Sequence, residues 1–485
     1  MQASTNQRLP NFEEALSTRN FCLVGLVATA IGSVASFSVG GILWKRQRVI
    51  YNGITDDYEQ TPTGFYSTSA KEIASLLLNV YITACSESLG FIHAASLRWT
   101  LYREGRLKYN SNLHLFTSAK HSYANGRCNN ILWAVSLALS YASVSQFILP
   151  NSPDSLFPGY IYNPAPLIIL GFSLLFQCLL AIWCLIPSEK RKILSWNSTP
   201  LNTTIAYCHM NGSSNTRIRI AIPATRQRSA FQSIRRIRHV LIALWSLVPI
   251  TVLWGVLIWF LAIKDLGKRD TSFSPNDDTG GFYPGTYDMD NYSSIAVNTL
   301  IIGMMQLIYT MALHIAELAV NTSRDESQWR KASILNRGIA LSVSSLTVAL
   351  TSWETVVLLI LKPVGHWIFG LSCLSFWYGW IAFHPIPIFC LSGFAFLLAT
   401  LVTVLLLKKP FGPQPSTYGD LQLLSTFIDD WRKEENGRLY WGDKGYFLDP
   451  SRRIVRIAGT SAIRQNLASI RMQEPYWGLK VEAVE

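Results

Sequence analysis

The sequence predicts an all-α polytopic membrane protein with about eight transmembrane helices and a small α+β cytosolic tail. Between Phe21 and Leu407 the chain contains successive apolar stretches with few internal charges. Hydrophobic residues make up 49% of the chain and charged residues 15%, a composition outside that of ordinary soluble domains. A helix of about 20 apolar residues crosses a ~30 Å hydrocarbon core and satisfies its own backbone hydrogen bonds. The apolar stretches therefore predict membrane spans.

The expected spans follow the apolar runs in chain order. They cover residues 21–44, 73–97, 130–149, 165–186, 239–263, 294–319, 339–361 and 386–407. Residues 1–20 would be a cytosolic N-terminal segment, 21–407 the transmembrane bundle and 408–485 a small cytosolic tail domain. The segment 363–383 is apolar enough for a possible ninth span. Prolines at its ends and a dense aromatic cluster instead favour a re-entrant or interfacial segment.

The charges of the loops orient this bundle. Residues 98–129 carry six Lys and Arg against one acid, and residues 187–238 carry ten against one. Residues 264–292 carry three basic and six acidic residues. Because cytosolic loops are enriched in Lys and Arg, the two basic loops are expected in the cytosol, together with both termini. The net charge of +12 is thereby explained by topology, and we expect no nucleic-acid partner.

A basic run precedes the fifth span, and we expect its guanidinium groups at headgroup depth. The residues are Arg228, Arg235, Arg236 and Arg238. Such a run attracts anionic lipid, so the expected partners include anionic headgroups at the cytosolic face. A role as topology determinant alone is the alternative. Among the Asn-X-Ser/Thr sequons, only Asn291 lies in a loop expected outside, so it is the glycosylation candidate.

Ionisable and amide side chains within the spans are candidates for a polar site, because a charge at bilayer depth costs roughly 2.5–3.5 kcal/mol on some scales. The candidates are Glu354, Glu87, His93, Gln306, His314 and Glu317. Gln306, His314 and Glu317 share one face of the sixth span. A His and a carboxylate one turn apart could relay protons, and a structural role is the alternative. Glu354 is expected near the middle of the seventh span, with no basic residue in that span to pair it.

The chain contains no nucleotide-binding loop, nucleophile motif or metal-ligand spacing. Its eight cysteines include no Cys-X-X-Cys pair and lie mostly in apolar stretches. Such cysteines are expected to be small buried hydrophobes and not disulfides or metal ligands. The sequence therefore predicts no cofactor and no metal, and it indicates no catalytic residue.

The tail after Lys409 predicts a small fold of its own. Residues 420–431 place apolar side chains at helical spacing. The following GRLYWGDKGYFLD predicts a β-hairpin with its turn at Gly442–Gly445, and residues 453–458 could add a third strand. A folded tail of this kind offers a docking site for a protein partner.

Several runs in this region have a recognisable pattern: PFGPQPSTYGDLQLL, FIDDW, LYWGDKG and RIAGTS, with LLILKPVGHWIFGLS before the last span. Together they resemble the carboxyl-terminal signature of a group of large fungal multi-spanning membrane proteins of uncharacterised function. The likeness covers the earlier helices only in their layout. A His often follows the Tyr-Gly in that group, where this chain has Asp420. The resemblance implies no known activity.

Three functions are compatible with these observations. A non-catalytic membrane scaffold or sensor with a partner-docking cytosolic tail is favoured. A transporter-like protein with a polar intramembrane pathway is one alternative, and an intramembrane acid–base enzyme acting on a lipid-soluble substrate is the other. The expected localisation is integral and multi-pass, in either the plasma membrane or an endomembrane.

Overall fold

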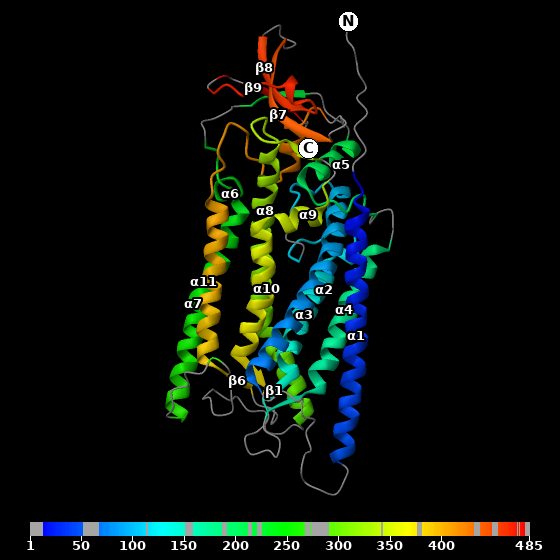
Figure 1. Ribbon diagram of the computed structural model, residues 1–485, viewed down its shortest axis with the longest axis vertical. Helices are drawn as coiled ribbons and strands as arrows, with labels where there is room; N and C mark the ends of the chain where they lie inside the picture. The colour runs from blue at the N-terminus through cyan, green and yellow to red at the C-terminus, as the bar shows by residue number, and fades with distance from the viewer. Residues whose placement is uncertain are drawn as a thin grey trace.

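Long helices run side by side beneath a smaller mixed domain at one end (Figure 1). The structure is a computed structural model. It describes residues 13–51, 67–112, 115–150, 159–186, 192–211, 216–220, 226–266, 273, 291–340, 343–375, 381–430, 437–448, 454–472, 474 and 476–480. The N-terminal segment 1–20 lies largely outside this part, and its end already belongs to the first helix.

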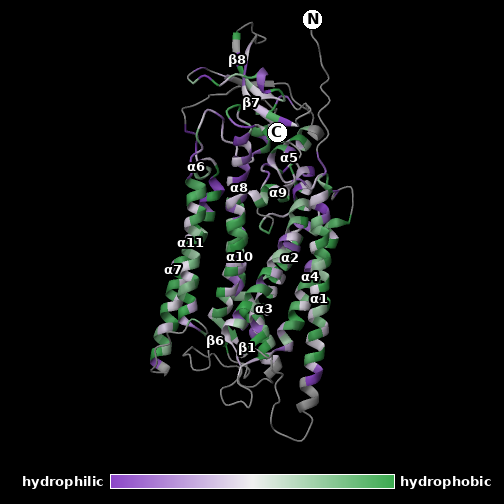
Figure 2. Cartoon of the chain, viewed as in Figure 1, coloured by the Kyte–Doolittle hydropathy of each residue, from purple (hydrophilic) through white to green (hydrophobic). Residues whose placement is uncertain are grey.

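The long helices confirm the predicted fold class. They are α1 (Leu16–Tyr51), α2 (Thr68–Arg103), α3 (Arg127–Phe147), α4 (Pro164–Leu185), α7 (Arg235–Leu266), α8 (Asn291–Lys331), α10 (Trp353–Ser372) and α11 (Pro385–Leu407). Within the described residues, all of these except α3 are long and apolar enough to cross a membrane. Helix α3 is more polar and largely buried inside the bundle. Figure 2 shows the long helices mostly hydrophobic, with more hydrophilic residues toward the upper end of α8.

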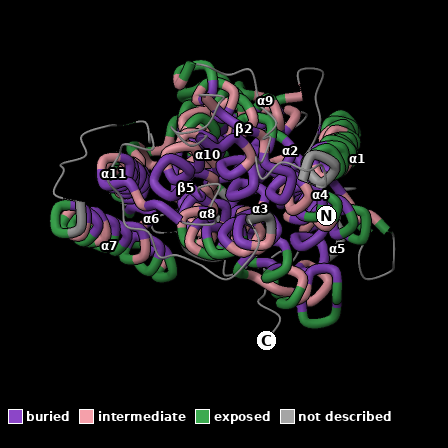
Figure 3. The backbone as a smooth tube through the Cα atoms, turned by 90° about the horizontal axis from the view of Figure 1, so that it is seen from below, coloured by how far each residue is buried: buried purple, intermediate pink, exposed green. Residues whose placement is uncertain are grey.

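The helices pack in a fixed order across the bundle. Helix α1 lies against α4, α11 lies against α7, and α3 contacts both α4 and α8. Seen from below, α3, α8 and α10 lie near the middle, with α7 and α1 at opposite edges (Figure 3). Glycines allow close approach of these central helices. A Cβ at Gly370 of α10 would lie 2.6 Å from the Cβ of Ser145 in α3.

The seventh span differs from the expected 339–361. Helix α9 (Ser345–Thr351) ends before Ser352, which has an extended backbone, and α10 then begins at Trp353. Helix α10 continues through Pro363 to Ser372, because neighbouring helices can accommodate a proline inside a buried membrane helix. The expected span was therefore placed too early in the chain.

The segment 363–383 does not form a span of its own, because residues 363–372 complete α10. Residues 373–375 and 381–383 form the antiparallel pair β5 (Cys373–Ser375) and β6 (Ile381–Phe383) at the end of the bundle. Residues 376–380, with the aromatic cluster on which the re-entrant or interfacial prediction depended, lie outside the described residues. Pro385 starts α11, as expected for a proline in the first turn of a helix. A second short pair, β1 (Ile148–Pro150) and β2 (Tyr160–Tyr162), lies near β6 at the same end of the bundle (Figure 1).

The domain at the opposite end, here called the cap domain, is built from the tail and from two loops. Its sheet has the order β3-β9-β8-β7-β4. The strands are β3 (Thr216–Ile220), β4 (Ile339–Ala340), β7 (Arg438–Leu448), β8 (Ile454–Ser461) and β9 (Tyr476–Lys480), and the helices are α5 (Pro200–Asn211) and α12 (Leu421–Phe427). The core of the domain contains Trp329 of α8 with Trp441 and Tyr476. The domain thus includes chain segments that lie outside the predicted tail 408–485.

The predicted hairpin at Gly442–Gly445 is wrong. Strand β7 runs through these residues and pairs with β8, with an irregular register between Asp443 and Tyr446. Gly445 has a φ of 88°, and the Asp443 carboxylate accepts a hydrogen bond from its backbone NH at 2.7 Å. These residues form a bulge that keeps the strand continuous. The third strand expected at 453–458 is β8, the partner of β7.

The predicted helix 420–431 is shorter in the structure. Helix α12 ends at Phe427, because the backbone NH groups of Asp429 and Asp430 donate to the Thr460 hydroxyl of β8. Trp431 lies outside the described residues. Asp420 caps the start of the helix, and its side chain accepts a hydrogen bond from the Leu423 NH. Partial burial raises the pKa of the Asp420 carboxyl above its usual value. The hydrogen bonds of this carboxyl and the charge of Lys108 act in the opposite direction, but their effect is smaller.

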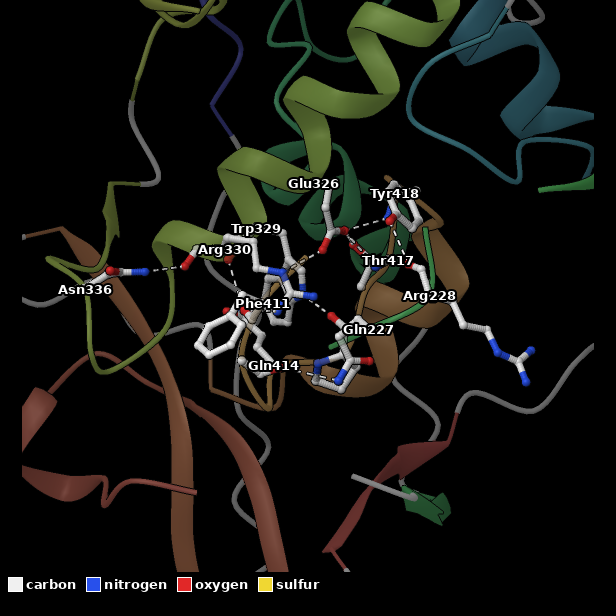
Figure 4. A network of polar contacts seen from close by, with 12 residues as sticks. Gln227, Arg228, Glu326, Trp329, Arg330, Asn336, Phe411, Gln414, Thr417 and Tyr418 are labelled. Carbon is white, nitrogen blue, oxygen red and sulfur yellow. Dashed lines mark hydrogen bonds and ion pairs between the residues drawn. The ribbon is translucent and has the colours of Figure 1, made fainter. Parts of the chain in front are cut away.

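Helix α8 joins the bundle to the cap domain through a polar junction (Figure 4). Glu326 accepts hydrogen bonds from the backbone NH groups of Thr417 at 2.8 Å and Tyr418 at 2.9 Å. Trp329 donates to the Pro415 carbonyl, and Gln414 donates back to the Trp329 carbonyl, both at 2.8 Å. The upper end of α8 is therefore held firmly by the chain that follows α11.

Candidate functional site in the helix bundle

A buried lysine links three helices at the middle of the bundle. Lys362 is the tenth of the 20 residues of α10 and is 4% exposed. Its Nζ pairs with the Glu87 carboxylate of α2 and lies 2.9 Å from Oε2 of Glu317 in α8. Nδ1 of His314, one turn before Glu317, lies 3.3 Å from the same oxygen. We call Glu87, His314, Glu317 and Lys362 the charged cluster.

The helix directions explain why these side chains meet. Helix α10 runs away from the cap domain, whereas α2 and α8 run toward it (Figure 1). Side chains on a helix tilt toward its N-terminus. Lys362 therefore points toward the cap domain, and Glu87 and Glu317 point away from it. The long lysine side chain spans the remaining separation.

A polar stripe continues from the charged cluster along α2. It consists of Lys71, Ser75, Asn79, Thr83 and Glu87. These residues recur every fourth position, so successive members lie one turn apart on a stripe that winds around the helix, and the first four are buried. A buried stripe of this kind does not contact lipid. It points into the bundle, toward α3 and α10.

Hydrogen bonds join this stripe to the other central helices. Nδ1 of His366, one turn after Lys362 in α10, lies 3.1 Å from Nε2 of Gln306 in α8. The His366 ring stacks on Tyr141 of α3, with centroids 3.4 Å apart. The Tyr141 hydroxyl lies 3.1 Å from the Thr83 hydroxyl. One polar network therefore links α8, α10, α3 and α2.

Asn79 has hydrogen-bonding capacity that the described residues do not use. Its Nδ2 donates to the Ser75 carbonyl at 2.9 Å, whereas its Oδ1 accepts from none of the residues that the structure describes. The residue is 1% exposed. A buried amide oxygen without a donor is costly, and such atoms are commonly satisfied by water or a polar ligand.

A second ion pair lies at the far end of the stripe. Lys71 Nζ is 2.8 Å from Glu72 Oε1, and the Trp367 indole of α10 donates to Glu72 Oε2 at 2.9 Å. Lys71 also lies over the Tyr160 ring of β2. We call the buried polar residues between the two ion-paired ends the polar path: Ser75, Asn79, Thr83, Tyr141, Gln306 and His366.

The charged cluster adjoins a small cleft on the cap-domain side. The cleft is lined by His314, Glu317, Leu318 and Asn321 of α8 and by Asn112, Leu115 and Phe116 of the loop after α2. Its volume of about 10 Å³ is close to the space that a cavity needs to hold one water molecule. The side chains of Glu87 and Glu317 are 33% and 26% exposed. Glu317 can therefore meet water in the cleft, and Lys362 is buried behind it.

The structure brings four of the six sequence candidates together. Glu87, His314 and Glu317 form the cluster, and Gln306 lies in the polar path. His93 is elsewhere: it is buried and stacks on Trp133.

The placement of Glu354 needs correction. It lies in the first turn of α10, not in the middle of a span, and accepts a hydrogen bond from the Ser352 hydroxyl at 2.8 Å. A carboxylate at a helix N-terminus is stabilised by the helix dipole. The same helix also contains a basic residue, Lys362, so the expectation of an acid in a span without one was wrong.

Sequence reasoning missed Lys362, His366 and Tyr141. The expected seventh span ended one residue before Lys362, so the lysine was assigned to a boundary where cations are ordinary. A signal was present: Lys362 and His366 are four residues apart in an otherwise apolar run. That spacing places both on one helix face.

The predicted lipid-contact residues lie together at the start of α7. Arg228, Arg235, Arg236 and Arg238 are exposed, next to the exposed Lys408 and Lys409 after α11. The guanidinium of Arg238 lies over the Phe231 ring. Asn291, the glycosylation candidate, begins α8, and its side chain lies outside the described residues.

Within the described residues, no group of three or more His, Cys, Asp and Glu side chains is arranged to hold a metal ion. No protein-family model, curated protein or solved structure matches this chain.

Proposed function

We propose that this multi-pass membrane protein is transporter-like, with a pathway for a small polar or charged solute between α2, α3, α8 and α10. The polar path carries this proposal, because it continues from the charged cluster to the Lys71–Glu72 pair through buried side chains. The two ion-paired ends would act as gates. Polar and ionisable residues inside membranes commonly mark such pathways.

Energetics support a pathway over a purely structural role. A buried ion pair regains little more than the desolvation cost of its charges, and well-packed apolar residues often stabilise a protein better. A bundle that only needed to hold together would gain nothing from Lys362 between two carboxylates. A gate, in contrast, needs contacts that can be exchanged for contacts with a solute.

A scaffold or sensor with a protein partner at the cap domain is the second candidate. One observation favours it: α8 carries His314 and Glu317 in the bundle and Glu326 and Trp329 in the cap-domain junction. A change at the charged cluster could then reach the cap domain through one helix. The acid–base enzyme gains no such support, because Lys362 pairs with both carboxylates of the cluster.

The orientation completes the proposal. The basic loops and the exposed arginines at the start of α7 lie at the cap-domain end, so this end would face the cytosol and anionic headgroups. The likeness of the tail to fungal multi-spanning membrane proteins stays a prediction.

Cysteine accessibility tests the pathway. In a variant without native cysteines, Asn79→Cys and Thr83→Cys in the polar path are treated with a small cationic thiol reagent in sealed vesicles. Both are expected to react, because a thiol ionises and reacts only where water reaches it. Leu77→Cys is the matched control: it lies two residues from Asn79 on the exposed, lipid-facing side of α2 and should stay unmodified.

The outcome separates the two candidates. Modification of the path positions and not of Leu77→Cys supports a pathway. If neither Asn79→Cys nor Thr83→Cys reacts from either side of the membrane, the pathway is refuted and the scaffold or sensor remains.

A further inference from the structure

We infer that the charged cluster is a binding site for one exchangeable proton, taken up from the cleft at His314. In the transporter-like function proposed above, this proton is the ion that is transported or coupled to transport. The transport role rests on the proposed function, whereas the proton site rests on the cluster itself.

The balance of charge favours an added proton. Two carboxylates, Glu87 and Glu317, face one ammonium, Lys362, so these three groups carry a net charge of −1 when ionised. A net charge at bilayer depth is expensive. A proton on His314 would bring the four side chains of the cluster to a net charge of zero.

The order of the groups favours the same site. His314 Nδ1 and Lys362 Nζ both approach Oε2 of Glu317, at 3.3 Å and 2.9 Å. A protonated His314 completes an alternating series: Glu87 negative, Lys362 positive, Glu317 negative and His314 positive. Each of these three contacts then joins opposite charges. In the uptake step a hydronium ion in the cleft gives its proton to the imidazole and leaves a water molecule.

The surroundings favour a proton over a metal cation. Imidazole exchanges a proton near neutral pH, and His314 and Glu317 both line the cleft. A metal ion of similar charge needs several oxygen ligands, whereas the space between the two carboxylates is already taken by the Lys362 ammonium. Among the described residues, the titratable groups Tyr141 of α3 and His366 of α10 also lie near the cluster.

The polar path lies next to the charged cluster. His366 follows Lys362 by one turn of α10 and stacks on Tyr141 of α3, whose hydroxyl lies 3.1 Å from that of Thr83. Asn79 Oδ1, one turn from Thr83, is a buried acceptor without a donor among the described residues. A water molecule at this position would satisfy it.

The test follows the ring resonances of ¹⁵N-labelled histidines by NMR across a pH series, with the full-length protein in phosphatidylcholine nanodiscs. The His314 signal is the one absent from His314→Gln. Glu317→Gln and Glu87→Gln each remove a negative charge, so the proton affinity of His314 should fall by about tenfold or more. Lys362→Met removes the competing cation and should raise that affinity. Glu354→Gln, outside the cluster, is the control and should leave it unchanged.

Three results would overturn the inference: no His314 signal that titrates, no response to either carboxylate variant, or a His314 titration that shifts when sodium replaces choline. Each variant is first compared with the parent protein by size-exclusion chromatography. Where Lys362→Met aggregates, the two Glu→Gln variants, which keep the side-chain shape, carry the test.

The result is distinguishable from failure of the proposed function. If His314 titrates and responds to the carboxylate variants while the cysteines in the path do not react, the proton site is supported and transport is refuted. If the cysteines react while His314 does not respond, the pathway is supported and its solute is not the proton.

Discussion

At the scale of single residues, the bundle depends on how Lys362 is compensated. Both carboxylates reach it from other helices, α2 and α8, so no local sequence pattern specifies the contact. Removing one member of a buried ion pair is more costly than replacing the whole set by neutral groups. This asymmetry makes the cluster testable by stability measurements alone.

We expect Lys362→Met to destabilise the protein by about 3–5 kcal/mol, because Glu87 and Glu317 lose their counter-ion. The triple variant Glu87→Gln, Glu317→Gln and Lys362→Met should recover most of this loss. Thermal unfolding in detergent, followed by intrinsic tryptophan fluorescence, measures both. A single variant as stable as the parent would show that Lys362 is not ionised between the two carboxylates.

At the scale of elements, α3 illustrates why hydropathy underrates a central helix. Its serines and Tyr141 are buried against neighbouring helices, so the helix needs little apolar surface of its own. Such a helix can lie close to its partners only where side chains are small. Gly370 lies directly against Ser145, in the same pair of helices in which His366 stacks on Tyr141.

Gly370→Leu should therefore push α10 away from α3. A Cβ alone would meet Ser145 at 2.6 Å, and we expect a loss of about 1–3 kcal/mol from overpacking. Gly393→Leu in α11 is the matched control, because nothing lies within 4 Å of a Cβ there. The same thermal unfolding assay compares them. Equal melting temperatures for the two variants would contradict the close approach of α10 and α3.

At the scale of the whole molecule, α8 connects two parts with different chemistry. Its lower part lies among lipid-facing helices, and its upper end is enclosed by the cap domain (Figure 1). The orientation of the entire chain therefore follows from the side on which the cap domain lies. One exposed thiol can report it.

Cys128 should react with a membrane-impermeant maleimide from the cytosolic side only. It is exposed at the cap-domain end of α3, whereas the other cysteines are buried or half-buried. Burial also raises the pKa of the Cys208 thiol in α5 to about 12, so that thiol stays unreactive at neutral pH. Intact cells and permeabilised cells are labelled in parallel, and mass spectrometry then identifies the labelled residue in each. Labelling of Cys128 from outside would reverse the orientation.

The sequence by itself determined the membrane class and most of the spans. Apolar length and loop charge are local properties, and a helix in lipid satisfies its backbone within one segment. The face shared by Gln306, His314 and Glu317 was readable for the same reason, since helical spacing is fixed. The seventh span was misplaced because Pro363 suggested a boundary, although the surrounding helices accommodate it.

Only the tertiary structure decided which polar residues act together. Glu354 was the most conspicuous acid in the sequence, yet it lies at a helix start and hydrogen-bonds to Ser352. Lys362 meets its partners from positions 275 and 45 residues away in the chain, and His366 stacks on Tyr141 of another helix. The cap domain likewise combines β3 and β4 from loops with the tail. Helical periodicity fixes the face on which a residue lies, whereas packing between distant segments fixes what that face meets.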